Sequence, residues 1–148
     1  MFKHILLPTD GSALAAKGVR AGVKLAKSLG ARVTGVYVIA PYVPPMYGEG
    51  AMYVPGVTVN DYKKAMEKQA AKALAVVEKE ARAARVRVAV RSLTDAPAWQ
   101  GILRAARSQK CDAIAMATHG RGGLGGLILG SETTRVLGHS KIPVVVVR

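Results

Sequence analysis

Glycine and hydroxyl residues in the last third of the chain have the types and the spacing of a phosphate-binding loop. The stretch ATHGRGGLGGLILGSETT, residues 117–134, contains six glycines and leads into a predicted helix that begins at Ser131. A helix N-terminus offers free backbone N–H groups and a partial positive charge to an anion. Glycines in front of such a helix let the anion approach the backbone. The alternative interpretation is that these glycines serve only tight turns.

Two common phosphate motifs do not match this stretch. Residues 120–125, GRGGLG, have the letters of the dinucleotide fingerprint, but they do not follow the first predicted strand, and no acidic residue lies about twenty positions later. Residues 125–131, GGLILGS, have the spacing of a Walker A loop without its Lys. Ser12 and Ser131 have no His and Asp in a recognisable triad pattern, so we assign no catalytic residue. No histidines share a metal-ligand spacing with Cys or carboxylates, so we expect no structural metal site.

Three further residues could contact a phosphorylated ligand. Asp10 lies in the turn PTDGS, residues 8–12, after the first predicted strand. Its carboxylate could bind ribose hydroxyls or a metal ion, or it could only cap the following helix, and the sequence leaves both open. Arg121 is the one Lys or Arg in the glycine loop and could reach a phosphate or be a solvated charge. His119 could donate to a phosphate or simply occupy a turn.

Strands and helices that alternate along the chain would position these residues. Apolar and β-branched runs predict strands over 2–7, 32–39, 86–93, 112–118 and 142–148. Amphipathic spacing predicts helices over 13–29, 60–84, 95–109 and 131–140. This order indicates an α/β fold with one parallel sheet, helices on both faces and a single domain over residues 1–148. Ligands of such sheets bind beyond the carboxyl ends of the strands, where the winding reverses.

The chain resembles the universal stress proteins over nearly its full length. HILLPTDGS is similar to the first strand and turn of that family, and HSKIPVVVVR is similar to its last helix end and strand. ATHGRGGLGGLILGS resembles the signature G-x2-G-x9-G-[ST] with Gly120, Gly130 and Ser131 in place and Ala117 instead of the first glycine. The resemblance implies a doubly wound five-stranded parallel sheet in the order 3-2-1-4-5. It also implies ATP binding, because the signature marks the ATP-binding members.

The resemblance implies roles for individual residues of an adenine nucleotide site, with ATP as the ligand, with or without Mg²⁺. At Ala117 the added methyl would lie where the backbone of the family approaches the ribose. At Glu132 only the backbone N–H would help, because the carboxylate would repel phosphate unless it points away. The implied site consists of Pro8, Thr9, Asp10 and Val38 at the adenine and ribose, Ala117 at the ribose, and Gly120, Gly130, Ser131 and Glu132 at the phosphates.

These residues lead us to expect a cytoplasmic ATP-binding protein that acts as a sensor or regulator of a stress response. The sequence shows no catalytic base, so we expect at most a slow ATPase. One alternative is a protein of the same fold that binds no nucleotide and acts through dimer and partner contacts. Another is an adenylating or ATP-cleaving enzyme of a related fold. Nucleic-acid binding would rest on the net charge of +13 alone, and we do not expect it.

Composition sets further expectations about partners and location. The basic run Lys63, Lys64, Lys68, Lys72, Lys79 and Arg82 has the spacing of one solvated helix face. A single cysteine, Cys111, cannot form an internal disulfide, and no apolar run is long enough to span a bilayer. The apolar run PVVVV would be an edge strand, so we expect a homodimer through the last strand. The long connection over residues 40–58 is expected to close over the nucleotide or a partner, or else to pack on the neighbouring helix.

Overall fold

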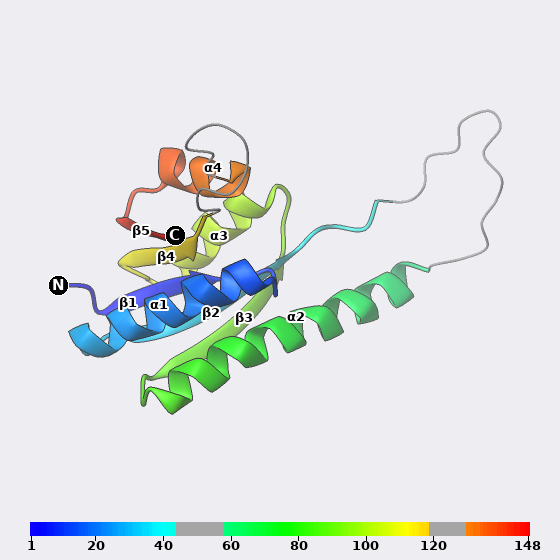
Figure 1. The fold of residues 1–148 in the computed structure, drawn as a ribbon. Coiled ribbons are helices and arrows are strands. Elements are labelled where there is room, and N and C mark those ends of the chain that lie inside the picture. The colour runs from blue at the N-terminus through cyan, green and yellow to red at the C-terminus, as the bar shows by residue number, and fades with distance from the viewer. Residues whose placement is uncertain (44–57, 119–129) are drawn as a thin grey trace.

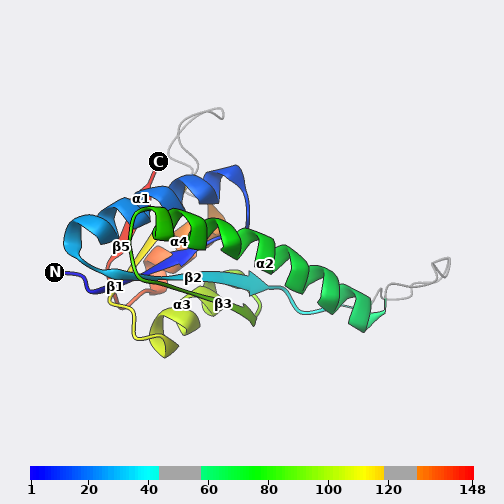
Figure 2. The ribbon, with the colours of Figure 1, turned by 90° about the horizontal axis from the view of Figure 1, so that it is seen from below.

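The computed structural model describes residues 1–43, 58–118 and 130–148. Its strands pair in parallel into one sheet with the order β3-β2-β1-β4-β5, which confirms the predicted topology. Helices cover both faces of this sheet (Figures 1 and 2). The elements in chain order are β1 (His4–Pro8), α1 (Ala13–Leu29), β2 (Arg32–Ile39), α2 (Val59–Ala83), β3 (Val88–Thr94), α3 (Ala98–Ser108), β4 (Ala113–Ala117), α4 (Ser131–His139) and β5 (Val144–Val147).

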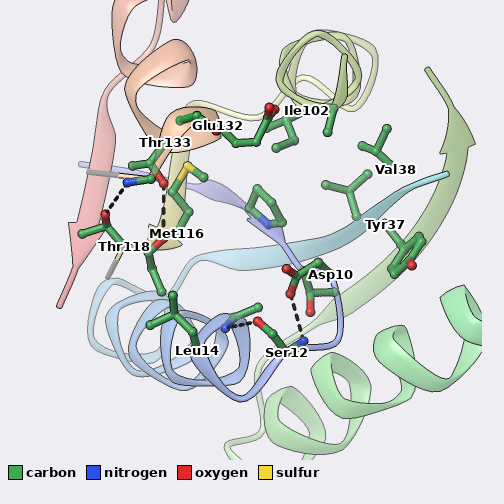
Figure 3. A pocket seen from close by; sticks show the side chains of 18 residues that line it. Asp10, Ser12, Leu14, Tyr37, Val38, Ile102, Met116, Thr118, Glu132 and Thr133 are labelled. Carbon is green, nitrogen blue, oxygen red and sulfur yellow. Dashed lines mark hydrogen bonds between the residues drawn. The ribbon is translucent and has the colours of Figure 1, made fainter. Parts of the chain in front are cut away.

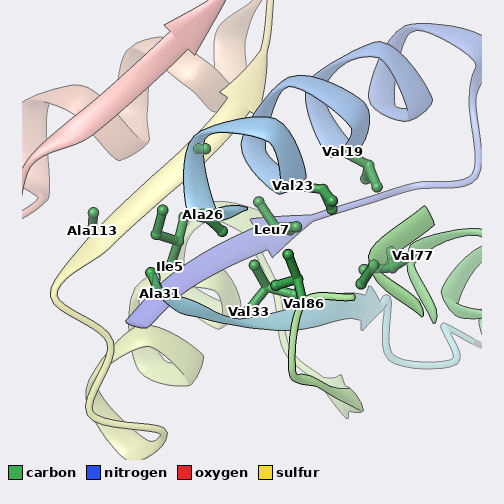
Figure 4. Packing of buried hydrophobic residues seen from close by; sticks show 12 residues of the cluster. Ile5, Leu7, Val19, Val23, Ala26, Ala31, Val33, Val77, Val86 and Ala113 are labelled. Atoms are coloured by element: carbon green, nitrogen blue, oxygen red, sulfur yellow. The ribbon is translucent and has the colours of Figure 1, made fainter. Parts of the chain in front are cut away.

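The sheet is buried on both faces because its central strand carries apolar side chains in both directions. Ile5 and Leu7 of β1 belong to a cluster with α1 and α2, which Figure 4 shows from close by. Leu6, between them, belongs to a second cluster with α3 and α4 on the opposite face. All three side chains are 0% exposed. A continuous apolar run is therefore what a central parallel strand requires.

Hydroxyl side chains cap the first two helices. Ser12 is the N-cap of α1, and its hydroxyl accepts a hydrogen bond from the backbone N–H of Ala15. Thr58 is the N-cap of α2, where it forms a capping box with Asp61. The six basic side chains predicted for one face of this helix are all exposed. Their exposure agrees with the interpretation of a solvated face.

Four of the five strands differ from their predicted bounds, and for the first and third strands local hydrogen bonds give the reason. The third strand begins at Val88, not at residue 86, because the Val86 N–H still donates to Ala81 O in the turn that closes α2. Arg85 makes that turn with a positive φ of 59°. The first strand runs to Pro8, because Thr9 N–H continues its pairing with Val36 O. No helix in the described part of the chain is long and apolar enough to cross a membrane.

Candidate functional site

A pocket of about 390 Å³ opens at the carboxyl ends of β1 and β4, the neighbouring strands between which the winding reverses. Figure 3 shows the side chains that line it. His119, Gly120 and Arg121, and residues 44–57 of the long connection, lie outside the described residues. All the other predicted site residues line the pocket: Pro8, Thr9, Asp10, Val38, Ala117, Gly130, Ser131 and Glu132.

The turn between β1 and α1 satisfies its own backbone N–H groups. Thr9 Oγ1 accepts from Gly11 N–H at 3.1 Å, and Asp10 Oδ1 accepts from Ser12 N–H at 2.9 Å. Ser12 Oγ then accepts from Ala15 N–H at 3.0 Å in the first turn of α1. Asp10 therefore shapes the turn while its carboxylate also lines the pocket. Side-chain oxygens of this turn therefore already occupy the N–H groups of Gly11, Ser12 and Ala15 at the start of α1.

The N-terminus of α4 faces the same pocket without a cap of this kind. Its N-cap is Gly130, which has no side chain, and Thr134 N–H makes the first intrahelical hydrogen bond to Gly130 O. The N–H groups of the first helical residues, Ser131 to Thr133, have no intrahelical partner. Both Ser131 and Thr133 line the pocket. This end of the pocket therefore suits an anion.

Two buried threonines fix the start of α4 to the end of β4. Thr118 Oγ1 accepts from Gly130 N–H at 3.2 Å, and the Thr133 hydroxyl donates to Ala117 O at 3.4 Å (Figure 3). Their exposed fractions are only 1% and 4%. Sequence analysis missed both residues, because each pairs with a residue 12 or 16 positions away. The only local signal for them in the sequence was that both hydroxyl residues lie close to positions of the family signature.

The edge of β2 contributes backbone groups to the other end of the pocket. The ladder between β1 and β2 ends at the pair Pro8–Val36, and Thr9 N–H donates to Val36 O. Alternate residues of a parallel strand direct their N–H and C=O groups to the same neighbour. Val38 therefore directs its N–H and C=O beyond the end of β1, toward the pocket. Its side chain packs on α3, where a Cβ on Gly101 would lie 2.7 Å from Val38 Cγ1.

Apolar side chains line the pocket next to this backbone edge. Val36, Ile102 and Met116 come from the cluster between the sheet and α3. Pro8 and Ala98 add to the same lining. The pocket thus has an apolar end with a backbone donor and acceptor, and a polar end at the N-terminus of α4.

Glu132 directs its carboxylate to α3. Its Oε2 accepts a hydrogen bond of 2.7 Å from the backbone N–H of Trp99, in the first turn of that helix. Pro97, the N-cap of α3, makes no side-chain cap of its own. The Trp99 ring packs on the cluster beneath α3, and its centroid lies 4.4 Å from the centroid of the His139 ring.

Titratable groups near the sheet have pKa values that follow from burial. Burial, and then the negative charge of Asp10, raise the pKa of Tyr37 at the pocket. Burial also raises the pKa of the Cys111 thiol to about 11, so this cysteine is a poor nucleophile. Among the described residues, no group of three or more His, Cys, Asp or Glu side chains could hold a metal ion.

Comparisons with known proteins point to one family. The Universal stress protein family model matches residues 1–148. The universal stress protein in the QAH/OAS sulfhydrylase 3'region of Thermus aquaticus is 34% identical over 158 residues, which cover 100% of both chains. A universal stress protein solved in complex with cAMP superposes with a TM-score of 0.72 at 20% identity, over 99% of this chain and 97% of that one. One from Archaeoglobus fulgidus in complex with dAMP gives 0.61 at 17% identity, over 100% and 98%.

Proposed function

The chain belongs to the universal stress protein family, and we propose that its pocket binds an adenine nucleotide. Two relatives of the same fold are complexes with cAMP and with dAMP, which supports this ligand class. The single observation that carries the proposal is the pairing of two features in one pocket. The unpaired backbone edge at Val38 lies at the apolar end, and the uncapped N-terminus of α4 lies at the other.

The apolar end suits the base. A purine ring would lie between Val36, Ile102 and Met116, where burial of its faces is favourable. Adenine presents an acceptor and an amino donor side by side, and the N–H and C=O of Val38 offer the complementary donor and acceptor. Asp10, at the end of β1, is the candidate acceptor for a ribose hydroxyl or ligand for Mg²⁺.

The polar end suits the phosphates. The free N–H groups of Ser131, Glu132 and Thr133 would donate to phosphate oxygens, and the dipole of α4 would stabilise their charge. Thr118 and Thr133 would hold these donors in place through their hydrogen bonds at the end of β4. Gly120 and Arg121 belong to the proposed phosphate contacts by sequence alone.

We extend the proposal to ATP, with or without Mg²⁺, and to a cytoplasmic sensor or regulator whose state depends on the bound nucleotide. Binding through backbone groups needs no catalytic base, so any hydrolysis of ATP would be slow. A homodimer through β5 completes the proposal, because β5 is an edge of the sheet. The second candidate is the same fold acting through dimer and partner contacts without a nucleotide; it is favoured by the two acidic side chains, Asp10 and Glu132, in the described pocket lining.

Calorimetric titration of a Gly130→Val variant tests the site. The branched side chain would stand among the free N–H groups of α4, so we expect a loss of at least about tenfold in affinity for ATP. Gly130 has a φ of −51°, which valine can adopt, so the fold should persist. Gly138→Val is the matched control, because a Cβ at Gly138 meets nothing within 4 Å. Equal affinities of the two variants would refute the assignment.

A further inference from the structure

Glu132 brings a negative charge into the wall of the proposed nucleotide pocket. It is the second residue of α4, between two residues whose N–H groups would bind phosphate. Asp10 and Glu132 are the charged members of the described pocket lining, and both are acidic. This is unexpected for an anion site in a chain with a net charge of +13.

The position of the carboxylate explains why the fold tolerates it. Glu132 Oε2 accepts from Trp99 N–H at 2.7 Å, at the N-terminus of α3. Figure 3 shows the side chain extended toward α3 beside Ile102. The carboxylate therefore lies near the positive ends of two helices, α3 and α4, and both stabilise it. It neutralises part of the positive potential that a phosphate chain would otherwise meet.

We infer that Glu132 is a specificity-determining residue that limits the number of phosphate charges the pocket accepts. This inference rests on the proposed nucleotide site. Each phosphate added to the ligand brings more negative charge near the carboxylate, whereas the free N–H groups of α4 stay the same in number. For charges about 9 Å apart at an effective dielectric constant of about 60, repulsion lowers affinity about threefold for each added charge. ATP carries about two more charges than AMP, so the carboxylate would penalise ATP about tenfold relative to AMP.

Two substitutions separate the charge of Glu132 from its contact with Trp99. Glu132→Gln removes the charge but keeps an amide oxygen that can accept from the Trp99 N–H. Glu132→Asp keeps the charge but shortens the side chain, which weakens the contact. Glu78→Gln, at a partly exposed position of α2, is the matched control, because it changes the net charge equally away from the pocket lining.

The experiment is calorimetric titration of each variant with AMP and with ATP, in a chelator so that no divalent cation masks the phosphate charge. We expect Glu132→Gln to raise the ATP-to-AMP affinity ratio about tenfold. The ratio should stay near that of the wild type in Glu132→Asp and Glu78→Gln. A thermal unfolding curve for each variant checks that the protein remains folded. If Glu132→Gln unfolds, Glu132→Asp is compared with the wild type instead. An ATP-to-AMP affinity ratio of Glu132→Asp that differs from the wild-type ratio by more than about threefold would then refute the inference.

The possible results separate this inference from the proposed function. Nucleotide binding with an unchanged ratio in Glu132→Gln would overturn the role of Glu132 and leave the proposed function standing. A lower ratio in Glu132→Gln would also overturn it, because the carboxylate would then favour the longer phosphate chain. If the wild type and every variant bind neither nucleotide, both the proposed function and this inference are wrong.

Discussion

Gly18 in α1 lies directly against Ala117 at the end of β4. A Cβ placed on Gly18 would be 2.7 Å from Ala117 N and 3.0 Å from Ala117 Cβ. The alanine methyl is therefore directed toward α1, in the space that the missing side chain of Gly18 leaves. The resemblance to the family placed this methyl where the backbone approaches the ribose, and in the structure it occupies the interface between α1 and β4.

Substitution of Gly18 should therefore be costly. In Gly18→Ala the added methyl would press on a backbone atom, so α1 would have to move away from the end of β4. We expect a loss of about 1–3 kcal/mol in the free energy of unfolding, measured in urea. Gly138→Ala in α4 is the control: nothing lies within 4 Å of the added methyl, and we expect a gain of about 0.5–1 kcal/mol. Equal stability changes would contradict this packing.

Ala117→Gly tests whether the departure from the family signature affects binding. Because the methyl faces Gly18, its removal should change the affinity for an adenine nucleotide by less than about threefold, or about 0.7 kcal/mol. The free energy of unfolding should fall by about 0.5–1 kcal/mol, because glycine is less favourable than alanine in a strand. An increase of tenfold or more in calorimetric affinity would show that the methyl does obstruct the ligand.

The backbone hydrogen bonds of β5 decide which substitution tests the proposed dimer. Pro143 O and Val147 O accept from Ile114 and Thr118 of β4, so the backbone groups of Val145 also face β4. Val146 then directs its N–H to the free edge of the sheet. Val145→Pro would break the sheet itself, whereas Val146→Pro removes only an outward N–H, which edge strands tolerate.

Sedimentation of both variants distinguishes loss of the dimer interface from disruption of the sheet. We expect a dimer for the wild type, a folded monomer for Val146→Pro, and a destabilised or aggregated protein for Val145→Pro. A wild-type protein that sediments as a monomer at micromolar concentration would exclude this interface, and so would a dimeric Val146→Pro variant.

The buried imidazole of His4 makes stability depend on pH. Burial, and then the positive charge of Arg32, lower the pKa of His4 below its usual value of 6.5. Below that value the unfolded chain binds a proton that the folded protein does not, so stability falls as the pH drops from 6.5 toward the folded pKa. Urea titrations between about pH 7.5 and about pH 5.5 should show this decline.

Two histidine variants test whether His4 causes this loss of stability at lower pH. His4→Gln should flatten the pH dependence of stability, because the group that titrates is gone. In the wild type, His4 Nε2 lies 2.8 Å from Thr34 Oγ1, and glutamine keeps a polar side chain near that hydroxyl. His139→Gln should leave the decline in place, because His139 is exposed. The account of His4 fails if its variant keeps the wild-type slope.

The sequence predicted the sheet and most of the pocket because both depend on local patterns. Apolar runs and the turn PTDGS placed Asp10 at the end of one strand, and the signature placed Gly130 and Ser131 at the start of a helix. Parallel strands end at one edge of a sheet, so the topology alone brings these residues together. The strand order itself came from the resemblance to the family.

The contacts that shape the pocket could not be predicted in the same way. Thr118 and Glu132 act on partners 12 and 33 residues away, Gly130 and Trp99, and no spacing rule connects such pairs. The close approach of Gly18 to Ala117 joins a helix and a strand that are about a hundred residues apart in the chain. Such pairs become visible only once the helices are placed on the sheet.

Amide NMR during titration with AMP or ATP tests the central claim most directly, because it reports where a nucleotide binds. We expect the resonances of Val38, Ser131 and Thr133 to shift together and to saturate with one affinity, since they lie at the two ends of one pocket. The resonances of Val88 and Cys111, which lie at the amino ends of β3 and β4, should stay unchanged. The absence of any shift at millimolar nucleotide, or shifts confined to residues outside the pocket, would contradict the proposed function.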